Sequence, residues 1–370
     1  MEENKKYRLT DETIEVEGKT LYRIEALKDF CEIKKGDKGG FIESENNLAH
    51  EGDAWVSDDA CVSDNARVCG NARVSDNASV SRYAQVYGNA RVSDNASVSR
   101  YAQVYGNARV SDNASVSDNS RVCGNARVCG EALVYGIACV YGDACVFDNA
   151  CVYNNASVSG YAQVYDNAIV YGDAWLYDNA CVYGNARVSD DARVCSNARV
   201  YGDALVYDNA RVYGNASVSD NARVCGNARV YGDALVYDNA RVSDNASVSR
   251  YAQVYGNVWV YGYARVSDNA RVCGNARVYG DALVRGDACV CGDAEISTDA
   301  DYIVFKNWWS SGRYFTWTRS NNMWSVGCFY GTGDELVKKA YKDSSKSGRQ
   351  YERIVKYVEE TLKEEENGGH

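Results

Sequence analysis

Between residues 54 and 300 the chain repeats a six-residue unit without an insertion or deletion. The unit reads Ala-x-Val-x, followed by Gly or Asp and then by Asn or Asp at most positions. Of 42 positions in the Ala phase only Ser120 and Val258 depart from Ala, and of 41 in the Val phase only Leu176 and Ile296 depart from Val. A repeat this regular predicts a repeat architecture, whatever the secondary-structure propensities of the individual residues.

The triplet Ala-x-Val has the alternation of a short strand, which sends both apolar side chains to one side. The next three positions favour residues that turn the chain. Three such sides make a triangular coil of about 18 residues, and stacked coils pair as parallel strands about 4.8 Å apart. The sequence therefore predicts an all-β solenoid of nearly fourteen coils.

Two further features support stacked coils. Residues 75 to 92 recur identically as residues 93 to 110, which is a shift of one coil. The 370 residues contain no proline, where average usage would give about eighteen. Proline lacks the N–H that pairs neighbouring strands, so its absence fits a chain of parallel ladders.

The spacing in Val68-Cys69-Gly70-Asn71-Ala72 resembles that of the left-handed parallel β-helix (hexapeptide-repeat) superfamily. The resemblance spans about two thirds of the chain and implies left-handed coils. The opening segment, with Lys38-Gly39-Gly40-Phe41-Ile42, also resembles an uncharacterised bacterial and prophage branch often labelled as transferases. That second resemblance implies a phage accessory or host-interference role as one hypothesis.

Three parts are expected along the chain. Residues 1–47 lose the repeat and read as an N-terminal β cap, with a hairpin around Glu17-Gly18-Lys19. Residues 48–300 form the β-helix. Residues 301–370 read as a C-terminal α+β cap with three strands, at 302–305, 313–318 and 324–330, and two helices, at 333–342 and 346–365. The N-terminal cap is expected to cover the open edge of the first coil.

The composition favours a cytoplasmic protein without a metal or cofactor. There is no apolar run of about eighteen residues and no apolar signal segment at the charged start. The fifteen cysteines lack the paired spacing of a disulfide framework and are expected to be free thiols. Cys289-Val290-Cys291 has the wrong spacing for a zinc knuckle, and His50 and His370 are the only histidines.

The repeats offer little for catalysis. Enzymes of the superfamily that the chain resembles are mostly acyltransferases, with a histidine general base at a subunit interface and projecting loops around the acyl donor. Residues 54 to 300 contain neither a histidine nor an inserted loop. His50 is the only internal candidate base, and its place in the Val phase also suits a residue that closes the first coil. An acyltransferase using His50 across a homotrimer interface stays as an alternative.

The net charge of −11 argues against direct nucleic-acid binding. Arginine nevertheless recurs at the outward position between Ala and Val, as at Arg73, Arg91, Arg109 and Arg127, with Asp at the adjoining turns. This pattern fits solvated surface charge or an anion-binding stripe. A second alternative is an acidic nucleic-acid mimic that occupies a DNA-binding protein, which the interleaved arginines disfavour.

Aromatic residues mark two candidate partner surfaces. At 18-residue steps Phe147, Tyr165, Tyr183 and Tyr201 are expected to stack into one ladder, and Tyr135, Tyr153 and Tyr171 into another. Such ladders stabilise a solenoid edge or provide a surface for partners. After residue 300 lie four of the seven tryptophans. Trp308, Trp309 and Arg313 fall on a predicted turn, as a recognition site or as part of a cap core.

The sequence thus favours a non-enzymatic structural or interaction protein. It predicts a rigid acidic rod that presents repetitive faces and an aromatic C-terminal unit to a macromolecular partner, most simply a protein. A homodimer or homotrimer is compatible with this interpretation, and neither membrane association nor a cofactor is expected.

Overall fold

The computed structural model describes residues 5–368 of the chain, and side chains as far as residue 365. It separates into two compact units, Met1–Gly214 and Asn215–His370. This division falls within the repeats. The division into three parts at residues 47/48 and 300/301 stays a prediction.

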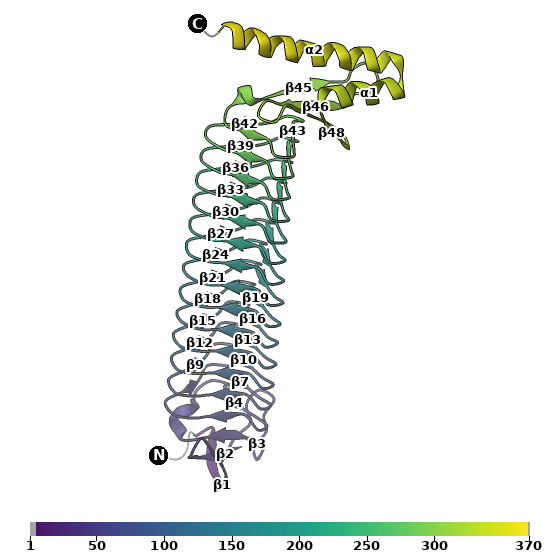
Figure 1. Ribbon diagram of the computed structural model, residues 1–370. Helices are drawn as coiled ribbons and strands as arrows, with labels where there is room; N and C mark the ends of the chain where they lie inside the picture. Colours follow the sequence, from purple (N-terminus) through teal and green to yellow (C-terminus); the bar gives the residue numbers. More distant parts are fainter. Residues whose placement is uncertain (1–4, 369–370) are drawn as a thin grey trace. The chain divides into compact units, whose positions relative to one another are not determined.

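Parallel two-residue strands build the repeats of both units. Each strand consists of the residue between Ala and Val and the Val-phase residue itself, from β4 (Trp55–Val56) to β44 (Glu295–Ile296). Strands one coil apart pair in parallel and in register, as do β7 (Arg73–Val74), β10 (Arg91–Val92) and β13 (Arg109–Val110) (Figure 1). Every third strand belongs to the same sheet, so the 41 strands make a parallel solenoid of about fourteen turns. The predicted solenoid is confirmed.

The Ala and Val phases form the core. Their side chains are almost all 0% exposed, including the exceptions Leu176 and Ile296. The hydroxyl of Ser120 sits among them because it donates a hydrogen bond to the Ser117 carbonyl at 2.7 Å. Each coil therefore buries six small apolar side chains, and the middle residue of each triplet points outward.

The fifth residue of each six-residue unit turns the corner in the left-handed backbone region. Asp76 has φ 60° and Gly88 has φ 71°, a region in which most side chains are strained. Aspartate is used there because it also links coils. The Asp94 N–H donates to the Asp76 carboxylate at 3.3 Å, and the Ser75 hydroxyl donates to the same carboxylate at 2.8 Å.

Asparagine at the sixth position forms side-chain ladders along the coils. The amide nitrogens of Asn71, Asn89 and Asn107 each donate to the side-chain oxygen one coil ahead, at 3.0 or 3.1 Å. Asn125 donates in turn to Asp143 at 2.9 Å. A carboxylate accepts but cannot donate, so the aspartate ends this row of amides.

The N-terminal strands cover the first coil. β1 (Tyr7–Val16) and β2 (Lys19–Ala26) form the predicted hairpin, and β3 (Lys38–Ile42) pairs antiparallel with β2 and parallel with β5 (Cys61–Val62). The 3₁₀ turn η1 (Glu45–Asn47) follows. Glycine is required in β3 because a Cβ added at Gly39 would lie 2.5 Å from the Val56 carbonyl oxygen. The exposed edge of the first coil is thus paired with a strand.

The C-terminal part of the second unit follows the 3₁₀ turn η2 (Asp299–Asp301) and begins with a four-stranded antiparallel sheet. Its strands are β45 (Tyr302–Lys306), β46 (Tyr314–Thr318), β47 (Met323–Val326) and β48 (Phe329–Gly331). The prediction of three strands was wrong, because Gly327, with φ 60°, turns residues 324–330 into a hairpin.

Two helices complete the second unit, α1 (Gly333–Asp343) and α2 (Ser345–Gly368), close to the predicted bounds. Their apolar faces pack on the sheet around a core that contains Phe315, Trp317, Trp324, Leu336 and Val355. Within residues 5–368, neither helix is both long and apolar enough to cross a membrane.

The asparagine ladder can be tested at Asn107, which both accepts from Asn89 and donates to Asn125. Asn107→Ala removes two hydrogen bonds and is expected to cost about 1–2 kcal/mol in the free energy of unfolding. Asn107→Asp keeps the acceptor and is expected to cost about half as much. Urea unfolding monitored by circular dichroism measures both, and equal costs for the two variants would contradict the ladder.

Candidate functional site

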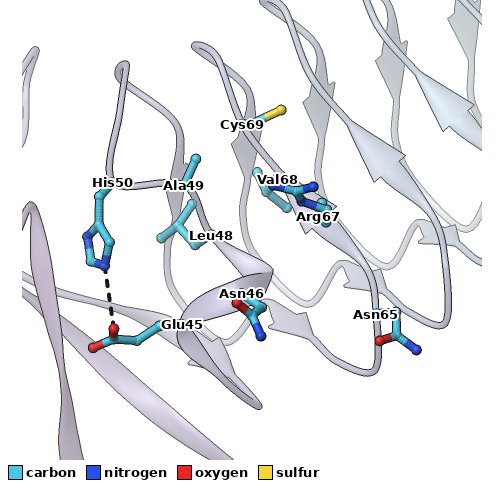
Figure 2. Close-up of a pocket in the computed structure, with 9 residues that line it drawn as sticks. All are labelled: Glu45, Asn46, Leu48, Ala49, His50, Asn65, Arg67, Val68 and Cys69. Atoms are coloured by element: carbon cyan, nitrogen blue, oxygen red, sulfur yellow. Dashed lines mark ion pairs between the residues drawn. The ribbon is translucent and has the colours of Figure 1, made fainter.

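His50 lies against the N-terminal strands in the first unit (Figure 2). Its ring stacks on the ring of Tyr7, with centroids 4.4 Å apart. Its Nδ1 accepts a hydrogen bond from the Lys6 backbone N–H at 3.3 Å. The other ring nitrogen, Nε2, lies 3.7 Å from the Glu45 carboxylate. Because Nδ1 accepts, the neutral ring carries its proton on Nε2.

This environment does not suit a general base. Burial lowers the pKa of His50, and the Glu45 carboxylate opposes that shift. The neutral ring has no unoccupied nitrogen lone pair to take a proton from a substrate. A hollow of about 460 Å³ does adjoin the ring. Its lining, shown in Figure 2, consists of Glu45, Asn46, Leu48, Ala49, His50, Asn65, Arg67, Val68 and Cys69.

The neighbours of His50 close the open end of the first coil. The Lys6 ammonium is buried and donates to the Ala54 carbonyl at 2.7 Å, and burial lowers the pKa of Lys6 to about 8. The Tyr7 hydroxyl donates to the Leu48 carbonyl at 2.7 Å. In a longer stack, a preceding coil would donate hydrogen bonds to the carbonyls of Ala54 and Leu48. Here the Lys6 and Tyr7 side chains make those bonds instead, and the His50 ring packs beside them. His370 lies outside the described residues.

The predicted aromatic ladders form within the first unit. Phe147, Tyr165, Tyr183 and Tyr201 stack with successive centroids 4.9 Å apart and nearly parallel planes. The second ladder has spacings of 4.8 Å from Tyr135 to Tyr153 and 5.2 Å from Tyr153 to Tyr171. The rings are half-buried, so their faces are mostly occupied by one another. Their role as a partner surface stays a prediction.

The residues predicted to lie together on the C-terminal turn differ in exposure. Trp308 is 77% exposed, whereas Trp309 is only 8% exposed and packs edge-on against Phe315 and Tyr351. Arg313 is exposed. Trp309 thus contributes to the core of this sheet, which leaves Trp308 and Arg313 accessible to a partner.

A buried side chain, Asn307, fixes that turn. Its amide donates to the Tyr351 hydroxyl at 3.0 Å, and its oxygen accepts from the N–H and the hydroxyl of Ser310, both at 3.0 Å. The Asn307 carbonyl accepts from the Gly312 N–H at 2.8 Å. Trp308 therefore projects from a well-anchored turn.

The structure reveals a site that the sequence analysis missed. Arg82, Tyr83, Arg100 and Tyr101, here called the Arg-Tyr patch, occupy the corners of two successive coils. The two tyrosine rings stack at 5.0 Å, and their side chains are 50% and 56% exposed. They line a hollow of about 490 Å³. The same hollow is lined by Asp64, Asn65, Asp118 and Asn119.

Carboxylates bracket the patch. The Arg100 guanidinium pairs with Asp118, and the Arg82 backbone N–H donates to Asp64 at 3.0 Å. The Lys19 ammonium, from the N-terminal hairpin, pairs with Asp64 and lowers the pKa of that carboxyl. These contacts fix the backbone and one of the two guanidinium groups.

Arginine at a corner position is the sequence signal that could have revealed the patch. Arg82 and Arg100 have φ of 63° and 61° at corners that elsewhere carry mostly glycine or aspartate. A long side chain at this conformation is strained, and such strain often marks functional positions. The segment Ser-Arg-Tyr-Ala-Gln-Val occurs at residues 81–86, 99–104 and 249–254.

The arginines of the charged stripe lie in register, as predicted. Arg73, Arg91, Arg109 and Arg127 lie side by side in register on consecutive coils. The neighbouring corner carboxylates accept backbone N–H groups of the next coil, as Asp76 does. Rows of bound carboxylates interleaved with arginine do not give the continuous negative surface that a nucleic-acid mimic requires.

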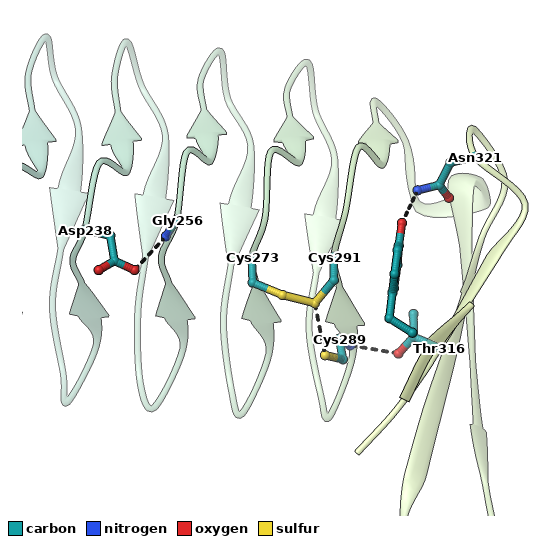
Figure 3. The surroundings of a disulfide bond; sticks show 8 residues. Asp238, Gly256, Cys273, Cys289, Cys291, Thr316 and Asn321 are labelled. Atoms are coloured by element: carbon teal, nitrogen blue, oxygen red, sulfur yellow. Dashed lines mark hydrogen bonds between the residues drawn. A yellow bond between two sulfur atoms is a disulfide. The ribbon is translucent and has the colours of Figure 1, made fainter. Parts of the chain in front are cut away.

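The expectation of free thiols was wrong for two cysteines. Cys273 and Cys291 form a disulfide in the second unit, with Cα atoms 4.6 Å apart. Their separation of 18 residues places them in the same column of consecutive coils, which a search for local cysteine spacing overlooks. Cys289 lies beside them (Figure 3), so a group of three cysteines forms where no zinc knuckle was expected. Most others, such as Cys61, Cys145 and Cys181, are free.

Comparison with known families agrees with the fold. The family model described as the YdcK beta solenoid repeat matches ten segments of the chain. The chain is a parallel β-helix protein. The matched segments are residues 66–82, 84–100, 102–118, 162–178, 180–196, 204–220, 222–237, 234–250, 252–268 and 270–286. They include Arg82 and Arg100 of the Arg-Tyr patch but not Tyr83 or Tyr101.

Other comparisons add little on function. A search of curated proteins finds no match. Among solved structures, the chain is similar to a crystal structure described as that of a putative acetyltransferase from Desulfovibrio desulfuricans G20. The identity is 10% and the TM-score 0.20, over 68% of this chain and 77% of that chain. At this TM-score the similarity carries no argument about activity.

The capping role of His50 predicts a pH dependence. Its pKa is lowered in the folded state, so the unfolded chain takes up a proton first as the pH falls below about 6.5. The free energy of unfolding of the first unit is therefore expected to decrease from pH 7 to pH 5. His50→Phe keeps a ring against Tyr7 but cannot titrate, and it should flatten this decrease. Urea midpoints at pH 5, 6 and 7 measure it, and the same slope in both proteins would contradict the assignment.

Proposed function

We propose that the protein is a non-catalytic binding protein whose stacked coils hold a rigid surface for a protein partner. The observation that carries this proposal is the Arg-Tyr patch. Arginine and tyrosine dominate the residues that supply most binding energy in protein interfaces. In this patch two exposed tyrosines and two arginines lie together on adjoining coils, beside a hollow of about 490 Å³.

The backbone supports binding by being ordered in advance. The Tyr83 N–H donates to the Arg100 carbonyl at 2.8 Å, and the Tyr101 N–H donates to the Asp118 carbonyl at 2.9 Å. Both tyrosines therefore stand on a hydrogen-bonded corner, and their stacked rings restrict each other. A partner that binds here orders few side chains, which lowers the entropic cost of association.

The chemistry of the patch favours a peptide segment that carries carboxylates next to apolar side chains. Guanidinium groups bind carboxylates through paired N–H donors, and the exposed tyrosine edges offer apolar area. Asp64 and Asp118 line the same hollow, and Arg100 pairs with Asp118. The proposal therefore assigns the partner's carboxylate to the Arg82 guanidinium, beside the exposed tyrosine edges.

The alternative of an acyltransferase has weaker support. It depends on His50, whose Nδ1 already accepts from the Lys6 N–H and whose Nε2 faces Glu45. The nucleic-acid mimic is disfavoured by the interleaved arginine stripes.

We also propose a cytoplasmic location, supported by the exposed or half-exposed free thiols such as Cys31, Cys61 and Cys181, which reducing compartments preserve.

Substitutions in the patch test the proposal. The double variant Tyr83→Ala/Tyr101→Ala is expected to lose at least about 10-fold of the partner captured from a lysate of the source organism, because such residues contribute about 2 kcal/mol or more each. Tyr161→Ala is the matched control, since Tyr161 occupies the same corner position, is 63% exposed and has Gly160 in place of arginine. Cross-linking followed by quantitative mass spectrometry measures capture.

A third variant separates the two candidate surfaces. Trp308→Ala removes the exposed tryptophan of the C-terminal turn and is expected to leave this capture unchanged. If Trp308→Ala abolishes capture while the double variant retains it, the partner binds the turn and the assignment to the patch is wrong. Equal capture by all variants would refute both surfaces.

A further inference from the structure

Three cysteine sulfurs meet at the last coils of the second unit. Cys273 and Cys291 are joined by a disulfide, and the Cys289 sulfur lies 3.5 Å from that of Cys291 (Figure 3). All three sulfurs lie within 4.8 Å of one another, and all three residues are half-buried. Among the side chains that the structure describes, those of residues 5–365, no other group of three or more Cys, His, Asp or Glu ligand atoms has this proximity.

The repeat brings these cysteines together and the neighbouring sheet holds them. Cys273 and Cys291 follow Val in consecutive coils, so they share one column. Cys289 is the outward residue of β43 (Cys289–Val290), two residues before Cys291. Its backbone N–H donates to the Thr316 hydroxyl of β46 at 2.7 Å. The cluster is therefore anchored on both sides, by the preceding coil and by the C-terminal sheet.

We propose that Cys273, Cys289 and Cys291 form a redox-gated site for a thiophilic divalent metal ion of the zinc class. A dithiol reductant would convert the disulfide into two thiols and become a disulfide itself. The three thiols then lose three protons and bind the ion as thiolates. A disulfide oxidant would accept two electrons from Cys273 and Cys291 and become a dithiol, and the restored disulfide would remove two ligands and release the ion.

The geometry suits such an ion once the disulfide is reduced. Zinc–sulfur bonds of about 2.3 Å in a tetrahedral site place the sulfurs about 3.8 Å apart. Cys289 and Cys291 are already near that separation, at 3.5 Å. The Cα atoms of Cys273 and Cys291, 4.6 Å apart, allow their sulfurs to separate by side-chain rotation alone. With three protein ligands, the fourth position is left for water.

Thiolate ligands also determine which ions compete. Sulfur ligands favour zinc and other soft ions over magnesium or calcium, which take oxygen ligands. The ion would bridge two consecutive coils and the strand that contacts Thr316, so its binding would stabilise the end of the coil stack in place of the disulfide. The same end would then be cross-linked under both oxidising and reducing conditions.

Site-resolved alkylation tests the proposal on the full-length chain. The reduced protein is treated with N-ethylmaleimide, with and without one equivalent of Zn²⁺, and each cysteine is followed by peptide mass spectrometry. Zn²⁺ is expected to slow the modification of Cys273, Cys289 and Cys291 at least about 10-fold, because bound thiolates are poor nucleophiles. Cys181, the free and half-buried outward residue of β25 (Cys181–Val182), should react at an unchanged rate.

Two variants show whether the three cysteines act together. Cys289→Ser is expected to remove the Zn²⁺ protection of Cys273 and Cys291, whereas Cys181→Ser should retain it. Co²⁺ provides a second readout, because its thiolate charge-transfer absorption should be lost in Cys289→Ser and kept in Cys181→Ser. The proposal is overturned if Zn²⁺ protects none of the three, if it protects all cysteines equally, or if Cys289→Ser retains protection.

Discussion

The backbone hydrogen bonds between consecutive coils are the interactions on which the rest of the structure depends. Within a typical six-residue unit, three N–H groups donate to carbonyls of the next coil. For one unit these are the bonds from Arg91 to Ala108, from Ser93 to Val110 and from Asn95 to Asp112, at 2.8–3.0 Å. A fourth N–H, that of Ala96, closes the corner by bonding the Ser93 carbonyl at 3.2 Å. This density of obligatory donors explains a chain without proline.

Because the bonds fix the register, equal positions lie directly over one another. Side chains that match in the sequence therefore meet in space: apolar residues inside, asparagines at one corner position, tyrosines along an edge. Each column adds a small energy at every coil, so stability accumulates through repeated neighbour contacts rather than in one large core. The same geometry leaves an unpaired edge at the end of a stack. In the first unit β3 pairs with that edge, while Lys6 and Tyr7 bond the Ala54 and Leu48 carbonyls beside it.

Much of the fold could be predicted from the sequence, because residues 18 positions apart in a regular repeat lie one above the other on consecutive coils. The solenoid, its core, the stacking of Phe147 on Tyr165 and the hairpin at Glu17-Gly18 all follow from local patterns or from the 18-residue step. The environment of His50 was not predictable, since Lys6 and Tyr7 reach it from more than 40 residues away. The corners at Arg82 and Arg100 have the same backbone conformation as other corners, with φ of 63° and 61° against 60° at Asp76, so only the arginine itself marks them. The disulfide could have been found by applying the 18-residue step to the cysteines.

The proposed partner site and the proposed metal site use the register in the same way, by placing side chains of one kind on consecutive coils. Both proposals therefore require that the coils are paired as described. Residue-resolved hydrogen exchange by NMR tests that pairing most directly. The outward residues Arg91, Arg109 and Arg127 all donate to the next coil at 2.9 Å, so their amides should exchange slowly and at similar rates. Exchange of any of these amides at the rate of an unfolded chain, under conditions where its neighbours are protected, would contradict the account.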